Sequence, residues 1–290
     1  MSEPRVAAGW SEHRFLSFDK TAIFYRRLET AQKNRAVLLI LHGMGEHGGR
    51  YRSVAEHLAP QGVVCYIPDL RGFGYSGGKR GCVRRFTDYF RDIGVVRDLA
   101  LRSGAGVPFF ILGHSFGGLI AASWIAASPE PLCRGMILSS PNFGISIPVP
   151  AWRRCLALWV SRVVPDYTQG NRVDLMKLTH DLSVIRDRSQ DPAIHNQISA
   201  GLYRELLQQL SRVKEIASKI RCSSLILQAG DDRVVSRSQT VRFYEYLDAQ
   251  DKELEIYENL YHELLNEVER PAIFVRISAW IEKRLDPLQF

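Results

Sequence analysis

The chain has 290 residues, of which 46% are hydrophobic and 24% charged. This composition is typical of a globular protein with one substantial core and excludes a disordered chain. We find no run near the roughly 18 apolar residues of a membrane-spanning helix and no signal peptide. The five cysteines are scattered, without a C-x-x-C pair, so we expect a cytoplasmic protein with no metal site.

Apolar segments with the pattern of strands alternate with helical ones, which predicts a parallel sheet with crossover helices. We expect a leading antiparallel hairpin at residues 14–18 and 22–25. Ser53 and Glu56 have the spacing of a capping box, which predicts that a helix opens there and ends near residue 59. The other elements expected in this part are strands at residues 36–41 and 63–67 and a helix at residues 86–101.

The net charge is +7, and basic residues gather in the loop after strand 63–67. They are Arg71, Lys79, Arg80, Arg84 and Arg85. Solvated surface charge is one explanation, and attraction to an anionic membrane or to phosphate head groups is the other. No nucleic-acid-binding motif accompanies the charge, so we expect no nucleic-acid partner.

Residues 113–117 read Gly-His-Ser-Phe-Gly and lie between a strand-like segment, residues 109–112, and an apolar helical segment, residues 119–127. G-x-S-x-G between a strand and a helix is the pattern of a nucleophile elbow. The glycines permit a turn so tight that side chains would collide, and the serine is forced into a strained conformation. A glycine-rich turn is the alternative, but the flanking segments favour Ser115 as a nucleophile.

Residues 143–216 interrupt the alternation, and we predict an all-helical cap inserted between two halves of a core, residues 1–142 and 217–290. Apolar residues recur at helical spacing near its start and form one stripe. They are Trp152, Cys155, Leu156, Trp159, Val160, Val163 and Val164. The stripe can pack on the main domain, and the helix can roof an acyl tunnel and touch lipid surfaces, with Trp159 as a substrate-binding residue. Both can hold for one helix, since a cap has an inner and an outer side.

A nucleophilic serine needs a base and an acid, which follow it in the chain order serine, acid, histidine in this type of fold. The strand-like segment 224–230 ends in Asp231 and Asp232, and only His262 lies beyond them, after strand 254–257. We therefore predict His262 as the base, whereas chemistry alone leaves both aspartates open as the acid. The remaining elements expected here are helices at residues 238–247 and 271–284.

Segments 41–47, 113–118, 230–233 and 261–262 together resemble the monoacylglycerol lipase/lysophospholipase branch of the α/β-hydrolases. The resemblance extends from about residue 13 to 283 and implies a mostly parallel central sheet with flanking helices and an inserted helical cap. It selects Asp232 as the acid, because the family's aspartate directly precedes an Arg-Val-like stretch.

The same resemblance implies an oxyanion hole formed by the backbone N–H groups of Met44 and Phe116, which would stabilise the charge that develops during acyl transfer. It also implies that Glu46 and Arg50 lie on the alcohol-binding side of the site. Related lipases often carry a further histidine three residues after the catalytic one, where this chain has Leu265. The alcohol recognised here can therefore differ from glycerol.

We thus predict a serine carboxylic-ester hydrolase that cleaves single-chain acyl lipids, such as monoacylglycerols or lysophospholipids, through an acyl-enzyme and without a metal or organic cofactor. A non-lipolytic esterase, a thioesterase or a proline-iminopeptidase-like peptidase would keep the same triad. A binding module on this fold is the non-enzymatic alternative. The expected partners are the acyl-ester substrate and an anionic membrane, contacted peripherally through the cap and the basic loop.

Overall fold

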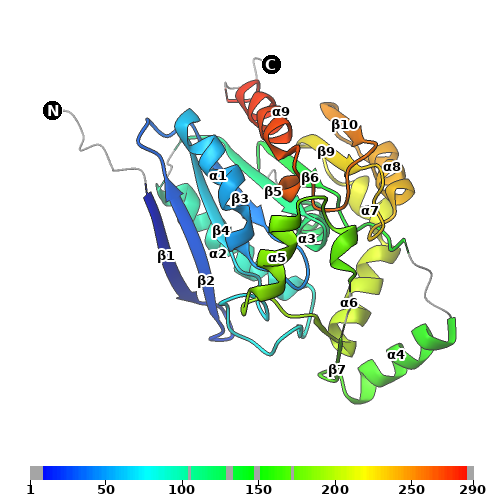
Figure 1. Cartoon of the computed structure of the whole chain (residues 1–290). Coiled ribbons are helices and arrows are strands. Elements are labelled where there is room, and N and C mark those ends of the chain that lie inside the picture. Colours follow the sequence, from blue (N-terminus) through cyan, green and yellow to red (C-terminus); the bar gives the residue numbers. More distant parts are fainter. Residues whose placement is uncertain (1–8, 104–105, 129–132, 147–150, 171–172, 286–290) are drawn as a thin grey trace.

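The computed structural model describes residues 9–103, 106–128, 133–146, 151–170 and 173–285. Within them, an eight-stranded sheet has the order β1-β2-β4-β3-β5-β6-β9-β10 (Figure 1). Strand β2 pairs antiparallel with both β1 and β4, and the other neighbouring strands of this sheet pair parallel. The strands are β1 (Gly9–Leu16), β2 (Ala22–Glu29), β3 (Ala36–Leu41), β4 (Val63–Pro68), β5 (Phe109–His114), β6 (Gly135–Ser139), β9 (Ser223–Ala229) and β10 (Lys252–Tyr257).

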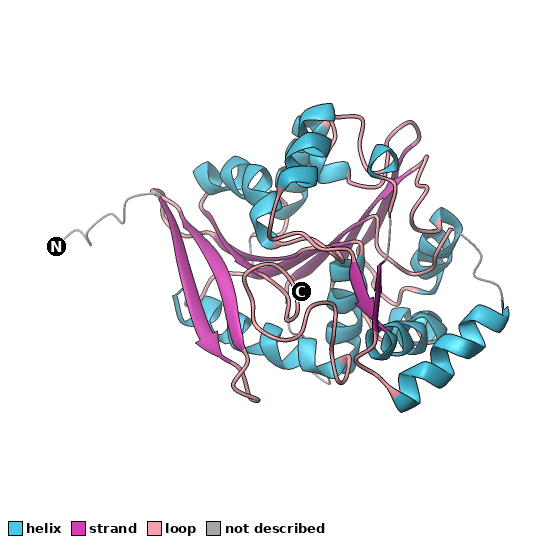
Figure 2. Ribbon diagram, turned by 60° about the horizontal axis from the view of Figure 1, so that its bottom comes forward, coloured by secondary structure: helices cyan, strands magenta, loops and turns pink. Residues whose placement is uncertain are grey.

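Helices cover both faces of this sheet, as Figure 2 shows. The central strands are therefore apolar on both sides: in β3, Val37 and Leu39 join the core of one face, and Leu38 and Ile40 join the other. One face is covered by α2 (Thr87–Ser103), α3 (Phe116–Ala127), α7 (Val213–Ala217) and α8 (Arg237–Tyr246), the other by α1 (Arg52–Leu58) and α9 (Arg270–Glu282). The predicted α/β-hydrolase architecture is confirmed.

The segment between β6 and β9 contains α4 (Ala151–Val163), α5 (Leu182–Gln190) and α6 (Ala200–Ser211). It also contains two strands, β7 (Thr168–Gly170) and β8 (Gln197–Ser199), which pair antiparallel. The expectation that this insertion is all helical is therefore wrong. Strands of three residues are too short to show an alternating pattern, and they form here because pairing links two distant segments of the insertion. The cap boundaries at residues 143 and 216 stay a prediction.

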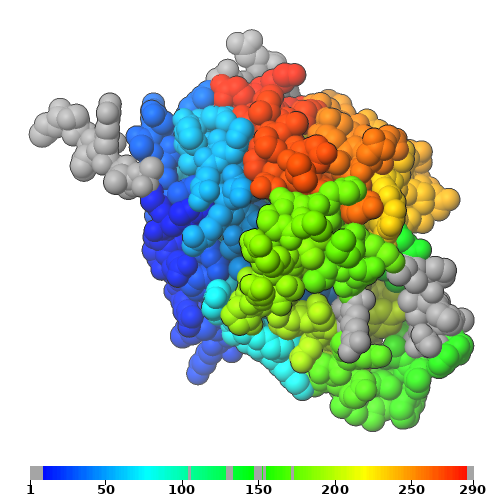
Figure 3. All heavy atoms as spheres, viewed as in Figure 1, coloured from blue at the N-terminus to red at the C-terminus, as the bar shows by residue number. Residues whose placement is uncertain are grey.

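The apolar stripe of α4 faces outward. Its side chains Trp152, Leu156, Trp159 and Val163 are between 53% and 64% exposed, so the interpretation that this stripe packs on the main domain is wrong. Helix α4 instead contacts α6 and occupies the edge of the molecule in Figures 1 and 3. Within the described ranges, no helix has the length and apolar character needed to cross a membrane.

Two local predictions also require correction. Helix α1 begins at Arg52, and its N-cap Tyr51 makes no side-chain capping bond, so there is no capping box at Ser53. The 3-10 helix η1 (Gly48–Tyr51) runs directly into α1, and the chain is already helical before Ser53. Arg71 is also not a surface charge: it is buried and donates to Asp92 through Nε and Nη2, both at 2.7 Å.

Candidate active site

Ser115 lies at the tight junction between β5 and α3, with φ 51° and ψ −116°. The junction requires glycine on both sides. A Cβ on Gly113 would lie 2.5 Å from the carbonyl oxygen of Gly117, and a Cβ on Gly117 would lie 2.4 Å from the carbonyl oxygen of Leu41. The strained serine conformation is thus fixed by backbone that a side chain could not displace.

Hydrogen bonds hold the serine backbone in this conformation. Its N–H donates to the carbonyl of Ser139 at the end of β6, at 3.0 Å, and its carbonyl accepts from Gly118 and Asn142, both at 3.0 Å. The Ser115 side chain is therefore presented at the carboxyl ends of the parallel strands, where open α/β sheets bind ligands.

The structure brings together the three residues that the sequence analysis selected. His262 Nε2 lies 2.9 Å from Ser115 Oγ, and His262 Nδ1 lies 2.8 Å from Asp232 Oδ2. In the tautomer in which Nδ1–H donates to Asp232, Nε2 is free to accept the serine proton. This arrangement can activate a serine hydroxyl for nucleophilic attack.

The Asp232 side chain has no solvent exposure. Its Oδ1 accepts the N–H groups of Val234 and Val235, both at 2.9 Å, and Gln228 Nε2 donates to Oδ2 at 3.2 Å. Burial would raise the pKa of this carboxyl, but His262 and the two backbone N–H groups lower it overall. Asp232 is therefore held as an oriented carboxylate.

His262 is 3% exposed. Burial by itself would lower its pKa, but the carboxylates of Asp232, Glu263 and Glu46 together outweigh burial, so that the pKa lies above its ordinary value of 6.5. The neighbouring His114 behaves in the opposite way, because burial and the approach of His262 lower its pKa to about 4. The two neighbouring histidines thus differ, because the pKa of His262 is raised whereas that of His114 is lowered.

The loop after β3 carries Met44, one of the two predicted oxyanion donors, and it is tied closely to Ser115. A Cβ on Gly43 would lie 3.4 Å from the Cβ of Ser115, and the Gly43 N–H donates to Glu46 Oε1 at 2.6 Å. Gly45, at φ 76°, lies against the His195 carbonyl, where a Cβ would be only 2.9 Å away. The predicted donor is thus held between the serine and the insertion.

The second predicted donor, Phe116, is the first residue of α3. The first N–H groups of a helix have no partner within it, and they carry the positive end of its dipole. A backbone N–H at this position can therefore stabilise negative charge beside Ser115. Phe116 itself is buried among aromatic rings, with Tyr89 at 5.6 Å between centroids, so the side chain anchors the helix start.

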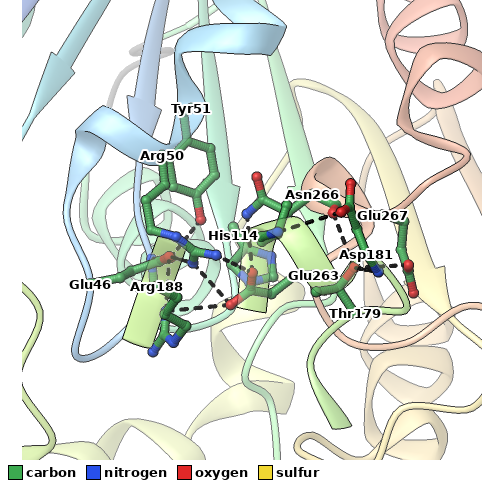
Figure 4. Close-up of polar contacts among 12 residues, drawn as sticks. Glu46, Arg50, Tyr51, His114, Thr179, Asp181, Arg188, Glu263, Asn266 and Glu267 are labelled. Carbon is green, nitrogen blue, oxygen red and sulfur yellow. Dashed lines mark hydrogen bonds and ion pairs between the residues drawn. The ribbon is translucent and has the colours of Figure 1, made fainter. Parts of the chain in front are cut away.

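Glu46 and Arg50 belong to a buried ionic cluster next to this centre, and Figure 4 shows how its side chains converge. Arg50 pairs with Glu46 and donates to Glu263 through Nη1 and Nη2, at 2.9 and 2.6 Å. Arg188, on α5 of the insertion, adds a second guanidinium, with Nη1 3.5 Å from Glu263 Oε1 and 3.6 Å from Glu46 Oε2.

Electrostatics favours the charged form of both carboxylates in this cluster. Burial would raise the pKa of Glu263, but Arg50 and Arg188 lower it to about 2. Burial likewise opposes ionisation of Glu46, and Arg50 together with His114 holds its pKa below the usual range. Two carboxylates and two guanidiniums, all nearly buried, therefore lie together beside His262.

Sequence reasoning did not find Arg188 or the role of Glu263. A single arginine in a polar helix has no distinctive signal, and its two partners are far from it in the chain. The position of Glu263, directly after the predicted base, was the one available hint.

Two further residues differ from their expected surroundings. Among the described residues no contact joins Trp159 to the other predicted site residues, and its side chain is 60% exposed on α4. Leu265, where related lipases often have a histidine, is 3% exposed and packs in the core with Leu264 and Ile273.

In the described part of the chain, no group of three or more His, Cys, Asp or Glu side chains could hold a metal ion.

Residues 32–269 match the family described as serine aminopeptidase, S33. The chain is 30% identical to phospholipase YtpA of Bacillus subtilis, over 87% of this chain and 97% of the relative. It is also 30% identical to human monoglyceride lipase, over 92% of this chain and 88% of the relative. The crystal structure of the Paleococcus ferrophilus monoacylglycerol lipase has a TM-score of 0.82 at 26% identity, covering 90% of this chain and 99% of that one.

Some relatives are longer. An abhydrolase domain-containing protein of Dictyostelium discoideum is 30% identical over 95% of this chain, which spans only 29% of its length.

The sheet, the strained serine after β5 and these matches define the chain as an α/β-hydrolase that hydrolyses esters. It belongs to the serine aminopeptidase S33 family and, among the α/β-hydrolases, to the branch of the monoacylglycerol lipases and lysophospholipases. The resemblance inferred from the four sequence segments is thereby confirmed.

Proposed function

We propose that the chain hydrolyses single-chain acyl lipids, with Ser115, His262 and Asp232 as its catalytic triad. The observation that carries the proposal is the pair of contacts of His262, at 2.9 Å to Ser115 Oγ and at 2.8 Å to Asp232 Oδ2. The names of the relatives, a phospholipase and monoglyceride lipases, support the substrate class.

In the proposed reaction, His262 Nε2 takes the proton of Ser115 as Oγ attacks the acyl carbonyl, and Asp232 stabilises the resulting imidazolium. The N–H groups of Met44 and Phe116 stabilise the negative charge on the carbonyl oxygen. His262 then gives the proton to the departing alcohol. Water hydrolyses the acyl-enzyme with the same base, and the serine is regenerated.

A peptidase is the main alternative, because the family description names aminopeptidases. An aminopeptidase must bind the positive α-ammonium group of its substrate, which calls for an available carboxylate near the nucleophile. The two carboxylates beside this site, Glu46 and Glu263, are already paired with Arg50 and Arg188. This pairing favours a substrate without an α-ammonium group and so supports ester hydrolysis.

We further propose that α4 contacts a lipid surface. Trp152, Leu156, Trp159 and Val163 lie on one exposed face of this helix, and tryptophans are favoured at the boundary between lipid and water. Lys79, Arg80, Arg84 and Arg85 are also exposed and would add attraction to anionic head groups. Arg71 does not contribute, since it is buried against Asp92.

The decisive experiment combines a covalent probe with a panel of substrates. A fluorophosphonate should label the wild-type chain but not Ser115→Ala, because labelling requires the activated serine. Hydrolysis should then be compared for monoacylglycerols, lysophospholipids, short esters and aminoacyl amides. Labelling that persists in Ser115→Ala would place the nucleophile elsewhere, and faster turnover of aminoacyl amides than of any lipid would establish the peptidase instead.

A further inference from the structure

Part of the insertion is fastened to the loop that carries His262. The Leu178 carbonyl accepts the N–H of Glu263 at 2.8 Å. Thr179 Oγ1 donates to the Asn266 carbonyl at 3.0 Å, and the His180 N–H donates to Glu267 Oε2 at 2.8 Å. Glu267 in turn accepts the N–H of Tyr261, the residue before His262, at 2.8 Å. The segment 178–191 therefore rests on the His262 loop (Figure 4).

Arg188 adds an ionic contact to these hydrogen bonds. It is 9% exposed and projects from α5 toward Glu263 and Glu46. Both carboxylates lie next to groups of the proposed active site: Glu263 follows His262 in the chain, and Glu46 accepts the Gly43 N–H beside the predicted oxyanion donor. Arg188 therefore reaches, from outside the sheet, the two acidic groups that border the proposed base and the oxyanion loop.

The hydrogen bonding of Arg188 is incomplete. Its Nε has no hydrogen-bond partner in the described part of the chain and is out of contact with solvent. A buried unpaired N–H is unfavourable and calls for an explanation. The long 3.5 and 3.6 Å contacts of Nη1 are also poor hydrogen bonds. The geometry suits a guanidinium retained for its charge rather than for well-formed bonds.

The Arg188 guanidinium balances the charge of the buried cluster. Glu46 and Glu263 together carry two negative charges, whereas Arg50 supplies only one positive charge to them, and Arg188 supplies the second. Without Arg188, one buried negative charge close to His262 would be left without compensation. An uncompensated negative charge stabilises a nearby imidazolium, so that a smaller fraction of the histidine is neutral and able to accept the serine proton.

We propose that Arg188 is a positioning residue for the reaction: it couples the seating of segment 178–191 to the charge balance around His262. The proposal rests on the proposed role of His262 as base. When the segment is seated, Arg188 compensates the second carboxylate, and His262 is neutral over a wider range of pH. The charged or titratable groups that face His262 are Asp232, Glu263, Glu46 and His114, with Arg50 and Arg188 behind the carboxylates.

The test is the pH dependence of kcat/KM for a dissolved short-chain ester. The fall of kcat/KM at low pH, its acid limb, reports the pKa of the base in the free enzyme. Arg188→Gln should move this limb to higher pH by about half to one unit, as expected for the loss of one nearby charge in a partly screened interior. Arg188→Lys keeps the charge and should restore the limb to within about 0.2 units of the wild type.

Arg186→Gln is the matched control. Arg186 lies on the same helix, its side chain is 68% exposed, and its substitution makes the same change in net charge. Its acid limb should coincide with that of the wild type. Suppose that the wild type is active and is labelled by a fluorophosphonate, but that Arg188→Gln and Arg186→Gln have the same acid limb. This result would overturn the role of Arg188 and leave the proposed function standing. An unlabelled, inactive wild type would instead refute the proposed function.

If Arg188→Gln is too unstable for its pH profile to be recorded, the double variant Arg188→Gln/Glu263→Gln provides the test. It removes one positive and one negative charge, so that Glu46 and Arg50 remain balanced. The double variant should unfold at a higher temperature than Arg188→Gln, and its acid limb should not lie above that of the wild type. A double variant less stable than the single one would show that Arg188 does not act through charge balance.

Discussion

Asp231 and Asp232 are adjacent in the chain, yet only the carboxylate of Asp232 reaches His262, at 2.8 Å. Asp231 is turned outward, where it pairs with Arg233 at 2.7 Å. Asp232→Asn should lower kcat by about 10⁴-fold, because an amide favours the wrong histidine tautomer. Asp231→Asn should change kcat little, because its carboxylate faces solvent. Steady-state hydrolysis of a short ester checks both variants, and a reversed order would make Asp231 the acid.

The raised pKa of His262 predicts the pH profile of the enzyme. The base must be neutral to accept the serine proton, so activity should fall as the pH drops through that pKa. The acid limb of kcat/KM should therefore lie above 6.5, the ordinary histidine value. In Asp232→Asn, burial is no longer outweighed, and the limb of the residual activity should move to lower pH. A wild-type limb below 6.5 would contradict the electrostatics of the site.

Trp159→Ala tests the proposed lipid contact of α4. The side chain is exposed, so its removal should leave the unfolding temperature unchanged. Binding to anionic vesicles should weaken roughly tenfold, since a tryptophan buries a large apolar area in the interface. Co-sedimentation with vesicles measures the effect, and Val275→Ala, which truncates an apolar side chain of 58% exposure on α9, is the control. Equal losses in the two variants would count against α4 as the contact surface.

Gly117→Ala should destabilise the fold by more than about 3 kcal/mol, because its Cβ would lie 2.4 Å from the Leu41 carbonyl oxygen. Gly94→Ala is the matched control. Nothing lies within 4 Å of a Cβ at this position inside α2, so alanine should stabilise the protein by about 0.5–1 kcal/mol. Urea denaturation measures both changes. A Gly117→Ala variant as stable as the wild type would mean that the turn is not tightly constrained.

The sequence was informative where function depends on local backbone geometry. The elbow around Ser115 could be recognised because strand, glycines, serine and helix follow one another without interruption. Asp232 and His262 could be placed because each follows a strand whose apolar pattern is clear. The assignment of Asp232 over Asp231 needed the family resemblance, since neither neighbouring carboxylate has a local signal of burial.

What the sequence missed depends on contacts between distant segments. Arg188 meets Glu46 and Glu263 only after the insertion folds onto the sheet. Arg71 was grouped with surface charges because its partner Asp92 lies on the following helix, α2. The short strands β7 and β8 are stabilised by one another rather than by any pattern of their own. In each case the determining interaction is tertiary.

The order of strands in the sheet has a consequence for synthesis on the ribosome. Strand β6 pairs on one side with β5, but its other neighbour, β9, is translated only after the whole intervening insertion. At ordinary rates of elongation, β6 therefore remains an open edge for several seconds. The nascent chain then holds the serine but neither Asp232 nor His262. With the proposed triad, catalytic competence arises only when β9 and β10 dock, so an emerging polypeptide cannot attack an ester before these two strands have been translated.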